Sequence, residues 1–360
     1  MAYKALPINL EEHRSRLLTL WKENMSDRHI AEAAERRFPW YYTLNPGGRP
    51  TTILLLDEDS NQIVGSGSFY PRKMVLDGAR LSIGVLADFL VQSKHRTAGA
   101  AVIIQRALAE SSRAAGVNFL AAYPNRLSEP IFKRVGYKQV GKANRWVKPL
   151  RSHKEMAKRV AHPLAAAAAS RVVDFGLSAL DLKRIARLSS SARKLQAISL
   201  DFCDERFDAL WERAKTAHLI TGERTSTYLQ WRYHDFPSLK YRFFALTDGA
   251  GERISAYLTF YINQDNAAII GDLFSDELTD TLDALILRFS VAQRRAGRST
   301  VYLDYLGPDS LGERFRNIGF CSRPTSRSLF VYFDSNTSED VQRLVSNPAN
   351  WFTLDAEMDV

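Results

Sequence analysis

The stretch FLVQSKHRTAGAAVIIQRAL, Phe89 to Leu108, decides the fold. It runs from an apolar segment of β type, through a cationic turn, into residues whose apolar positions have helical spacing. A strand, a turn and a helix in direct succession are typical of an α/β protein. The turn has two interpretations. It packs the helix against the sheet, or it holds a phosphate at the helix N-terminus, where free N–H groups and the helix dipole favour an anion.

Length and composition indicate a globular protein of about two domains. The 360 residues are 45% hydrophobic and 25% charged. Residues 1–18 lack the apolar core of a signal peptide, and no run approaches the roughly 18 apolar residues of a membrane span, so we expect a cytoplasmic protein. Only Cys203 and Cys321 occur, which favours buried free thiols over a disulfide. The seven His residues show no metal-ligand spacing, so no metal site is predicted.

The positive charge is concentrated in residues 138–195. This block holds 14 Lys and Arg against 3 Asp and Glu, a balance of +11, which exceeds the +9 of the whole chain. Its apolar spacing is helical, and we expect interruptions at Pro163 and Gly176. The favoured interpretation is a connecting helical segment with a solvated basic face. The alternative is a surface for anionic lipid, a polyanionic substrate or nucleic acid, which would place the protein peripherally at the inner membrane surface.

Two halves of the sequence resemble each other. Three pairs of residues are 191 positions apart: Trp40 and Trp231, Tyr42 and Tyr233, Pro46 and Pro237. Further on, FKRVGYKQVG resembles FRNIGFCSRP, with Gly136 and Gly319 183 positions apart. The ordered series predicts an internal duplication.

Each copy has the same expected order of elements. In the first copy a strand ends at Val91, a helix covers residues 98–115, the strand VNFLAAY follows, and the helix SEPIFKRV begins at Ser128 as its N-cap. These strands and helices, beside earlier antiparallel strands, predict an α+β fold with a mixed sheet. The predicted domains are 1–150, a basic helical linker at 151–198, and 199–360.

The first copy resembles the GNAT superfamily of acyl-CoA-dependent N-acyltransferases. The pyrophosphate loop of that family begins with Arg or Gln, followed by any two residues, Gly, any one residue, and Gly or Ala. An apolar residue lies five positions before the Arg or Gln. Val91 has the place of that apolar residue. The loop pattern is matched by Arg96, Thr97, Ala98, Gly99, Ala100 and Ala101. Downstream, residues 123–137 resemble the motif around the pantetheine arm.

The resemblance implies acetyl-CoA or another acyl-CoA as donor, with no metal. It implies that the backbone of Phe89, Leu90 and Val91 orients the acyl carbonyl. It implies cofactor contacts from Asn125, Ser128 and Phe132. The alternative for Asn125 is an Asx turn after Pro124.

The catalytic residues are less clearly marked. Asp88 is the carboxylate nearest the strand end and is a candidate base if apolar neighbours raise its pKa. Its alternative is a strand Asp that faces solvent or pairs with Lys94 or Arg96. Many family members have a Tyr acid where this chain has Phe132, so Tyr123, Tyr137 or water protonates the thiolate, or the thiolate leaves unaided.

The second copy departs from the family at the loop. SDELTDTLDALILRF has no Gly and carries four acidic residues between Asp276 and Asp283, which repel a pyrophosphate. We therefore expect one CoA per chain and a second half that supports the first or shapes the acceptor site.

Three functions stay open at this point. The first is N-acyl transfer, with acetyl as the favoured acyl group, to a small or sugar-linked amine. Tandem halves joined by a basic segment resemble bacterial proteins linked to cell-envelope polysaccharide. The second is a non-catalytic CoA sensor whose basic surface meets membrane or nucleic acid. The third is a transferase whose donor is aminoacyl-tRNA or acyl carrier protein.

Overall fold

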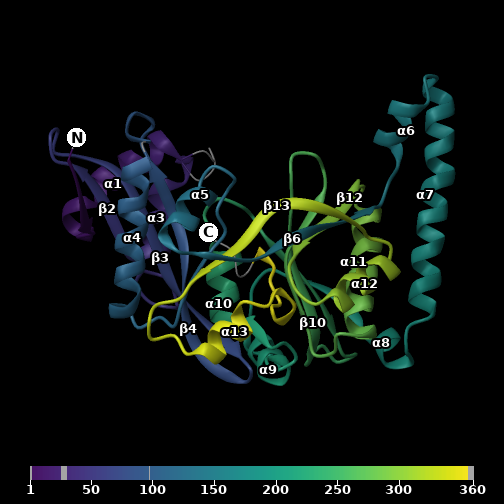
Figure 1. Ribbon diagram of the computed structural model, residues 1–360. Coiled ribbons are helices and arrows are strands. Elements are labelled where there is room, and N and C mark those ends of the chain that lie inside the picture. Colours follow the sequence, from purple (N-terminus) through teal and green to yellow (C-terminus); the bar gives the residue numbers. More distant parts are fainter. Residues whose placement is uncertain (1, 26–30, 97, 356–360) are drawn as a thin grey trace.

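A computed structural model describes residues 2–25, 31–96 and 98–355, and it forms two lobes around one mixed sheet (Figure 1). The strands of the first half are β1 (Tyr3–Pro7), β2 (Thr51–Asp57), β3 (Gln62–Leu76), β4 (Ala79–Val91), β5 (Leu120–Ala122) and β6 (Lys138–Pro149). Those of the second half are β7 (Gln196–Leu200), β8 (Ile220–Gly222), β9 (Arg242–Thr247), β10 (Ile254–Ile262), β11 (Ala268–Ser275), β12 (Thr300–Tyr305) and β13 (Cys321–Tyr332). The expected mixed α/β fold is confirmed.

The helices come in three groups. The first half has α1 (Leu10–Asn24), α3 (Ala34–Tyr42), α4 (Ala98–Ala114) and α5 (Glu129–Val135). The segment predicted as a linker contains α6 (His153–Arg159), α7 (Pro163–Ala186) and α8 (Ser190–Lys194). The second half has α9 (Glu205–Ala214), α10 (Ser226–Leu229), α11 (Asp280–Arg295), α12 (Asp309–Asn317) and α13 (Glu339–Val345). Pro163 begins α7, but Gly176 lies within it, so the expected interruption at Gly176 is wrong.

The described elements of the two halves follow a similar order, apart from β8 in the second half. The halves meet at a reciprocal contact. The indoles of Trp40 and Trp231 stack with centroids 4.6 Å apart and planes at 7°. Trp40 Nε1 donates to the Trp231 carbonyl at 2.8 Å, and Trp231 Nε1 donates to the Trp40 carbonyl at 2.9 Å. Each indole N–H donates to the other residue's carbonyl, and such a reciprocal contact is typical of two units related by a two-fold axis. Two residues paired in the predicted repeat therefore contact each other, and the duplication itself stays a prediction.

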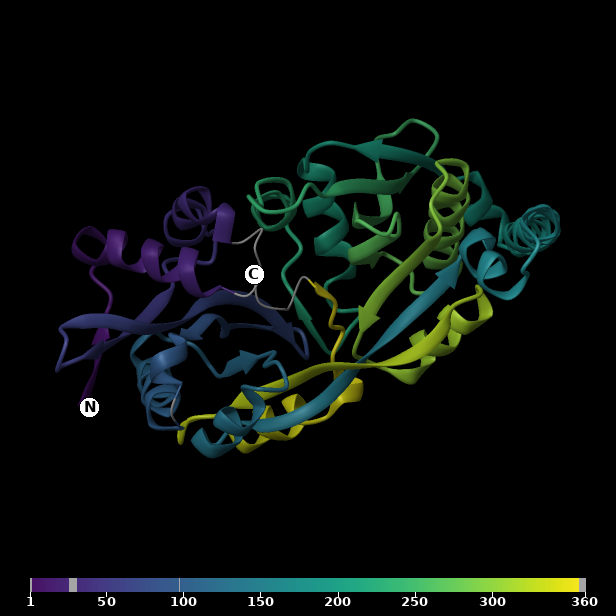
Figure 2. The same cartoon turned by 90° about the horizontal axis from the view of Figure 1, so that it is seen from above.

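The last strand of each half lies within the other half's part of the sheet. The sheet order is β1-β2-β3-β4-β5-β13-β6-β12-β11-β10-β9-β7, with β8 paired to β3. β13 therefore lies between β5 and β6, and β6 lies between β13 and β12 (Figure 2). The domain bounds stay a prediction, but the sheet itself is continuous across them.

The sheet positions α4 through a glycine. A Cβ on Gly67 in β3 would lie 2.8 Å from Ile104 Cγ2 and 3.1 Å from Leu108 Cδ1, so only glycine lets the helix pack this closely. Ile104 and Leu108 are fully buried in this contact. The N-terminus of α4 is thereby fixed next to the end of β4.

The expectation that both cysteines are buried needs correction. Cys321 is exposed and Cys203 is half-buried, so the thiols are free but not both buried. The aromatic residues Trp40, Tyr41, Tyr42, Trp231 and Tyr233 are all at most 3% exposed and lie in the core.

Candidate functional site

The site lies where β4 and β5 separate. The two strands pair in parallel only at Gly84 with Leu120 and Val85 with Ala121. β5 ends at Ala122, whereas β4 continues to Val91. Beyond Val85 the β5-facing edge of β4 has no strand partner in the described part of the chain. A strand edge with unpaired N–H and C=O groups is suited to an extended ligand that carries amides.

A bulge lies on β4 at this opening. Ser66 pairs with Leu90 and Ser68 pairs with Ala87, so Asp88 and Phe89 together oppose one residue of β3. Asp88 has φ of 56°, which is unfavourable for a residue with a Cβ. Its side chain is 2% exposed although the residue as a whole is half-buried, so the accessible part is main chain. The bulge turns backbone groups, not the carboxylate, toward solvent.

A buried ion pair holds the bulge. Arg37 on α3 donates from Nη1 to Asp88 Oδ2 at 2.9 Å and from Nη2 to Oδ1 at 2.8 Å, and the Arg37 side chain is 0% exposed. Burial raises the pKa of the Asp88 carboxyl, and Arg37 opposes that rise. The partner is thus Arg37, and the expected alternatives Lys94 and Arg96 are wrong. Because both carboxylate oxygens are engaged, the geometry favours a positioning role for Asp88; its role as a base stays a prediction.

The loop after β4 leads into an open helix N-terminus. Arg96 Nε donates to the Val91 carbonyl at 3.0 Å, which ties the loop back to the strand end. Thr97 lies outside the described residues, and α4 begins at Ala98, as expected. A Cβ added to Gly99 would meet nothing within 4 Å, so a ligand has free approach to that backbone. Ala100 and Ala101 are buried.

This geometry fits a pyrophosphate: a 17-residue helix has the open Gly99 as its second residue, and its start lies next to the unpaired edge of β4. In the same loop, Nδ1 of His95 lies 3.0 Å from the Tyr3 hydroxyl. Phe89 and Leu90 are half-buried at the same edge. The structure therefore brings together the strand and loop residues that the sequence assigned to the cofactor, Thr97 aside.

The segment after β5 forms an Asx turn. Asn125 Oδ1 accepts from the N–H groups of Leu127 and Ser128, each at 3.0 Å. The alternative stated for Asn125 is therefore what the structure has, and its cofactor contact stays a prediction. Ser128 precedes α5 as expected, but its hydroxyl donates to the Asn125 carbonyl at 3.1 Å and makes no capping bond.

The residues weighed as proton donors differ in burial. Phe132 is 3% exposed and packs edge-on against Phe89 and Tyr137, with centroids at 5.9 and 5.0 Å. Burial raises the pKa of Tyr137 well above its ordinary value, which makes it a weak acid. Tyr123 follows β5 directly and is half-buried as a residue, although its hydroxyl is buried, so its assignment as the acid stays a prediction.

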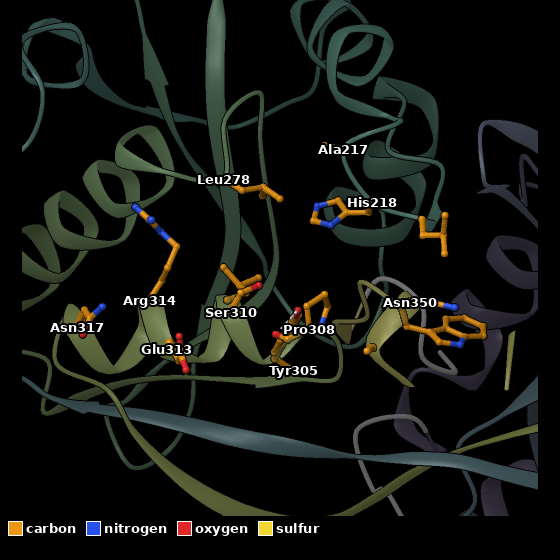
Figure 3. Close-up of a pocket in the computed structure, with 14 residues that line it drawn as sticks. Ala217, His218, Leu278, Tyr305, Pro308, Ser310, Glu313, Arg314, Asn317 and Asn350 are labelled. Carbon is orange, nitrogen blue, oxygen red and sulfur yellow. Dashed lines mark hydrogen bonds between the residues drawn. The ribbon is translucent and has the colours of Figure 1, made fainter. Parts of the chain in front are cut away.

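A pocket lies at the corresponding place in the second half (Figure 3). Its volume is about 560 Å³, and Leu278, Tyr305 and Pro308 place it between the loop after β11 and the end of β12. Arg314 in its wall donates to Asp283 at 2.9 and 3.2 Å. Asp283 thus neutralises the Arg314 guanidinium. The acidic segment from Asp276 to Asp283, which we predict to repel a pyrophosphate, borders the pocket at Leu278.

Sequence reasoning did not find His218, which also lines this pocket. It is 8% exposed and stacks on Phe352 with centroids 3.7 Å apart. Burial, together with nearby Arg224, lowers the pKa of His218 to about 3, so the ring is neutral. The signal was absent because residues 217–219 lie outside the repeated motifs. Among the described residues no group of three or more His, Cys, Asp or Glu side chains is arranged to hold a metal ion.

This architecture, with a splayed strand pair, a bulge at the opening and a helix N-terminus beside it, defines a GNAT-type N-acyltransferase fold. Residues 11–140 match the family model of the acetyltransferase (GNAT) domain. No curated protein sequence matches this chain significantly.

Three solved structures share the fold. A GCN5-related N-acetyltransferase from Anabaena variabilis has a TM-score of 0.64 at 12% identity over 92% of this chain and 73% of its own. A probable N-acyltransferase from Enterococcus faecalis has a TM-score of 0.63 at 11% identity over 92% and 72%. A GCN5-related N-acetyltransferase from Kribbella flavida has a TM-score of 0.57 at 12% identity over 92% and 72%. At these identities the likeness concerns the fold alone.

Proposed function

We propose that the protein transfers an acyl group, in the simplest case acetyl, from acyl-CoA to an amine by direct attack in a ternary complex. The observation that carries the proposal is the opening between β4 and β5, with the Asp88 bulge on one side and the free N-terminus of α4 at its end. The opening offers amide-pairing groups to pantetheine and the helix offers N–H groups to pyrophosphate. We place the reaction in the cytoplasm, where acyl-CoA is available.

The reaction needs little beyond orientation and proton transfer. Main-chain N–H groups at the bulge polarise the thioester carbonyl, as donors aimed at a developing oxyanion. The amine nitrogen attacks the carbonyl carbon, the C–S bond breaks, and an amide forms. The proton lost by the amine passes to water or a base, and the CoA thiolate takes a proton from Tyr123 or from water.

The acceptor is proposed as a small amine, with an amine on a sugar as the first class to screen. The N-acyltransferase fold supports an amine as acceptor. We further propose that the second half stabilises the first half or shapes the acceptor site. The second half is proposed to bind no CoA of its own because Asp276, Glu277, Asp280 and Asp283 surround the start of α11.

Two other functions each have one observation in their favour. Phe132, buried and unable to donate a proton, favours CoA binding without catalysis. The basic block favours a polyanionic or carrier-linked donor, although part of its charge is compensated, since Lys148 pairs with Asp181 at 2.8 Å.

Calorimetric titration with acetyl-CoA tests the proposal. We expect binding at about one equivalent, and loss of binding in Gly99→Glu, which places a carboxylate where the pyrophosphate would lie. Gly176→Glu is the matched control: it is also an exposed helical glycine whose added Cβ meets nothing within 4 Å, but it lies far along the chain on α7. Both variants should melt like the unmodified protein.

The outcomes separate the alternatives. Two equivalents would reject the assignment of the second half. Binding without thiol release in the presence of any amine tested would favour the sensor. No binding by the unmodified protein would reject acyl-CoA as donor and leave carrier-protein or tRNA donors.

A further inference from the structure

Helix α7 stands at the margin of the molecule with most of its surface uncovered (Figure 1). It has 24 residues, and its most apolar 18-residue window has a mean hydropathy of 1.2 with 11% of that window buried. It is the one described helix long and apolar enough to cross a membrane. At 1.5 Å per residue it is about 36 Å long. A helix of this composition is ordinarily covered by protein or lipid.

The side of α7 that faces the body is polar. Asp181 is 1% exposed and accepts from Lys148 Nζ at 2.8 Å and Arg294 Nη2 at 2.7 Å. About two turns earlier, Asp174 accepts from the N–H of Ser152 at 2.6 Å and from its hydroxyl at 2.8 Å. Ion pairs and hydrogen bonds therefore attach the helix, together with apolar contacts of Ala166, which is 2% exposed, and of Ile185, which packs against the core.

The side that faces away from the body is apolar. Leu164 is 76% exposed, Val172 73%, Phe175 76% and Leu182 55%. With Ala168 and Ala179 between them, these residues recur every three or four positions, so they form one stripe along the helix. We call this stripe the outer face of α7. Its polarity is the reverse of that of an ordinary surface helix.

Cations border the outer face. Arg171 and Lys183 are exposed on its two flanks, whereas both acidic residues of α7, Asp174 and Asp181, face the body. Exposed basic residues also occur just beyond each end of the helix, at Arg159 and Arg187. An apolar stripe framed by Lys and Arg is the pattern of a helix that lies in the interface of an anionic membrane.

We propose that the outer face of α7 docks on the surface of an anionic membrane, with its apolar side chains among the acyl chains and its flanking cations at the headgroups. The helix lies along the surface and does not span it, because lifting it from the body would leave Lys148 and Arg294 buried without Asp181. A second copy of the chain is the less suitable occupant. Pairing two outer faces in either direction sets Arg171 and Lys183 against cations.

Vesicle co-sedimentation of the full chain, without substrate, tests the proposal independently of the acyltransferase activity. The probes are vesicles of phosphatidylcholine alone and vesicles with about one third phosphatidylglycerol. We expect binding to the anionic vesicles only, weakened by added salt, since salt screens headgroup charge. Phe175→Ser should weaken binding roughly tenfold or more, and Arg171→Glu with Lys183→Glu should weaken it further on anionic vesicles.

Phe202→Ser is the matched control, because Phe202 is 59% exposed but lies between β7 and α9. It should bind like the unmodified protein, and both Phe variants should keep the melting temperature, since neither side chain is buried. Equal losses in the two variants, or no vesicle binding at all, would overturn the proposal. A dimer in solution that Phe175→Ser turns into a monomer, without vesicle binding, would assign the outer face to a second copy instead.

Discussion

Replacing Asp88 by Asn separates a positioning role from a catalytic one. The substitution keeps the shape of the side chain and removes the charge that faces Arg37. Because the two side chains are 0% and 2% exposed, Arg37 would keep its charge without a counterion. Removing one partner of such a buried pair costs about 3–5 kcal/mol. At about 2.1 cal/mol/K of unfolding entropy per residue, the 360-residue chain should melt about 4–7 °C lower if it unfolds as one unit.

Asp272→Asn provides the matched control from the second half. Asp272 has the corresponding place on β11, is fully buried, and accepts from Arg224 Nη2 at 3.0 Å. It should lower the melting temperature by a similar amount. Asp272 lies in the half to which we assign no cofactor, so its variant shows what destabilisation alone does to turnover.

The assay is thiol release from acetyl-CoA with an accepted amine, well below both melting temperatures. If Asp88 positions the bulge, Asp88→Asn should raise the KM for acetyl-CoA and leave the shape of the kcat pH profile unchanged. A loss of about 10²-fold to 10⁴-fold in kcat, together with loss of the acidic limb of that profile, is the signature of a general base. That result, with a melting temperature near that of the unmodified protein, would refute the reasoning.

Two further predictions concern stability. The pKa of His218 is about 3 in the folded protein and about 6.5 in the unfolded chain. Between these pH values the unfolded chain binds more protons than the folded protein. The free energy of unfolding therefore falls as the pH falls through this window, by at most about 1.4 kcal/mol per pH unit. His218→Phe, which keeps the stack on Phe352, should flatten the melting temperature between pH 6.5 and 4; parallel curves for the two proteins would contradict this. Removal of residues 199–360 should leave the first half without a stable fold, because Phe330 and its neighbours in β13 no longer cover β5. A truncated chain with a sharp thermal transition and native-like circular dichroism would show that β5 does not need that strand.

The local part of the site could be predicted from the sequence. The end of β4 at Val91 and the start of α4 at Ala98 follow from an apolar strand, small residues in a turn and helical periodicity. These sequence patterns depend only on neighbouring residues, and all of them occur between Phe89 and Leu108. The Asx turn at Asn125 is of the same kind, because it depends on one side chain and the two residues after it.

The parts that were missed depend on residues far apart in the chain. Nothing near Asp88 points to Arg37, which lies 51 positions away. The sequence of α7 shows an apolar stripe but not which side faces the body, and that choice is made by Asp174 and Asp181 reaching partners on other elements. Strand neighbours are likewise not encoded by periodicity, which is why the places of β6 and β13 could not be predicted.

The positions of β6 and β13 bear on how folding depends on the amount of protein. If the two halves were separate chains, completing each would require a collision with the other, and their melting temperature would rise with protein concentration. Here the linker keeps each final strand near its acceptor at a local concentration of the order of millimolar, so assembly is unimolecular. The folded state should therefore survive dilution to the low levels at which an enzyme is present in a cell.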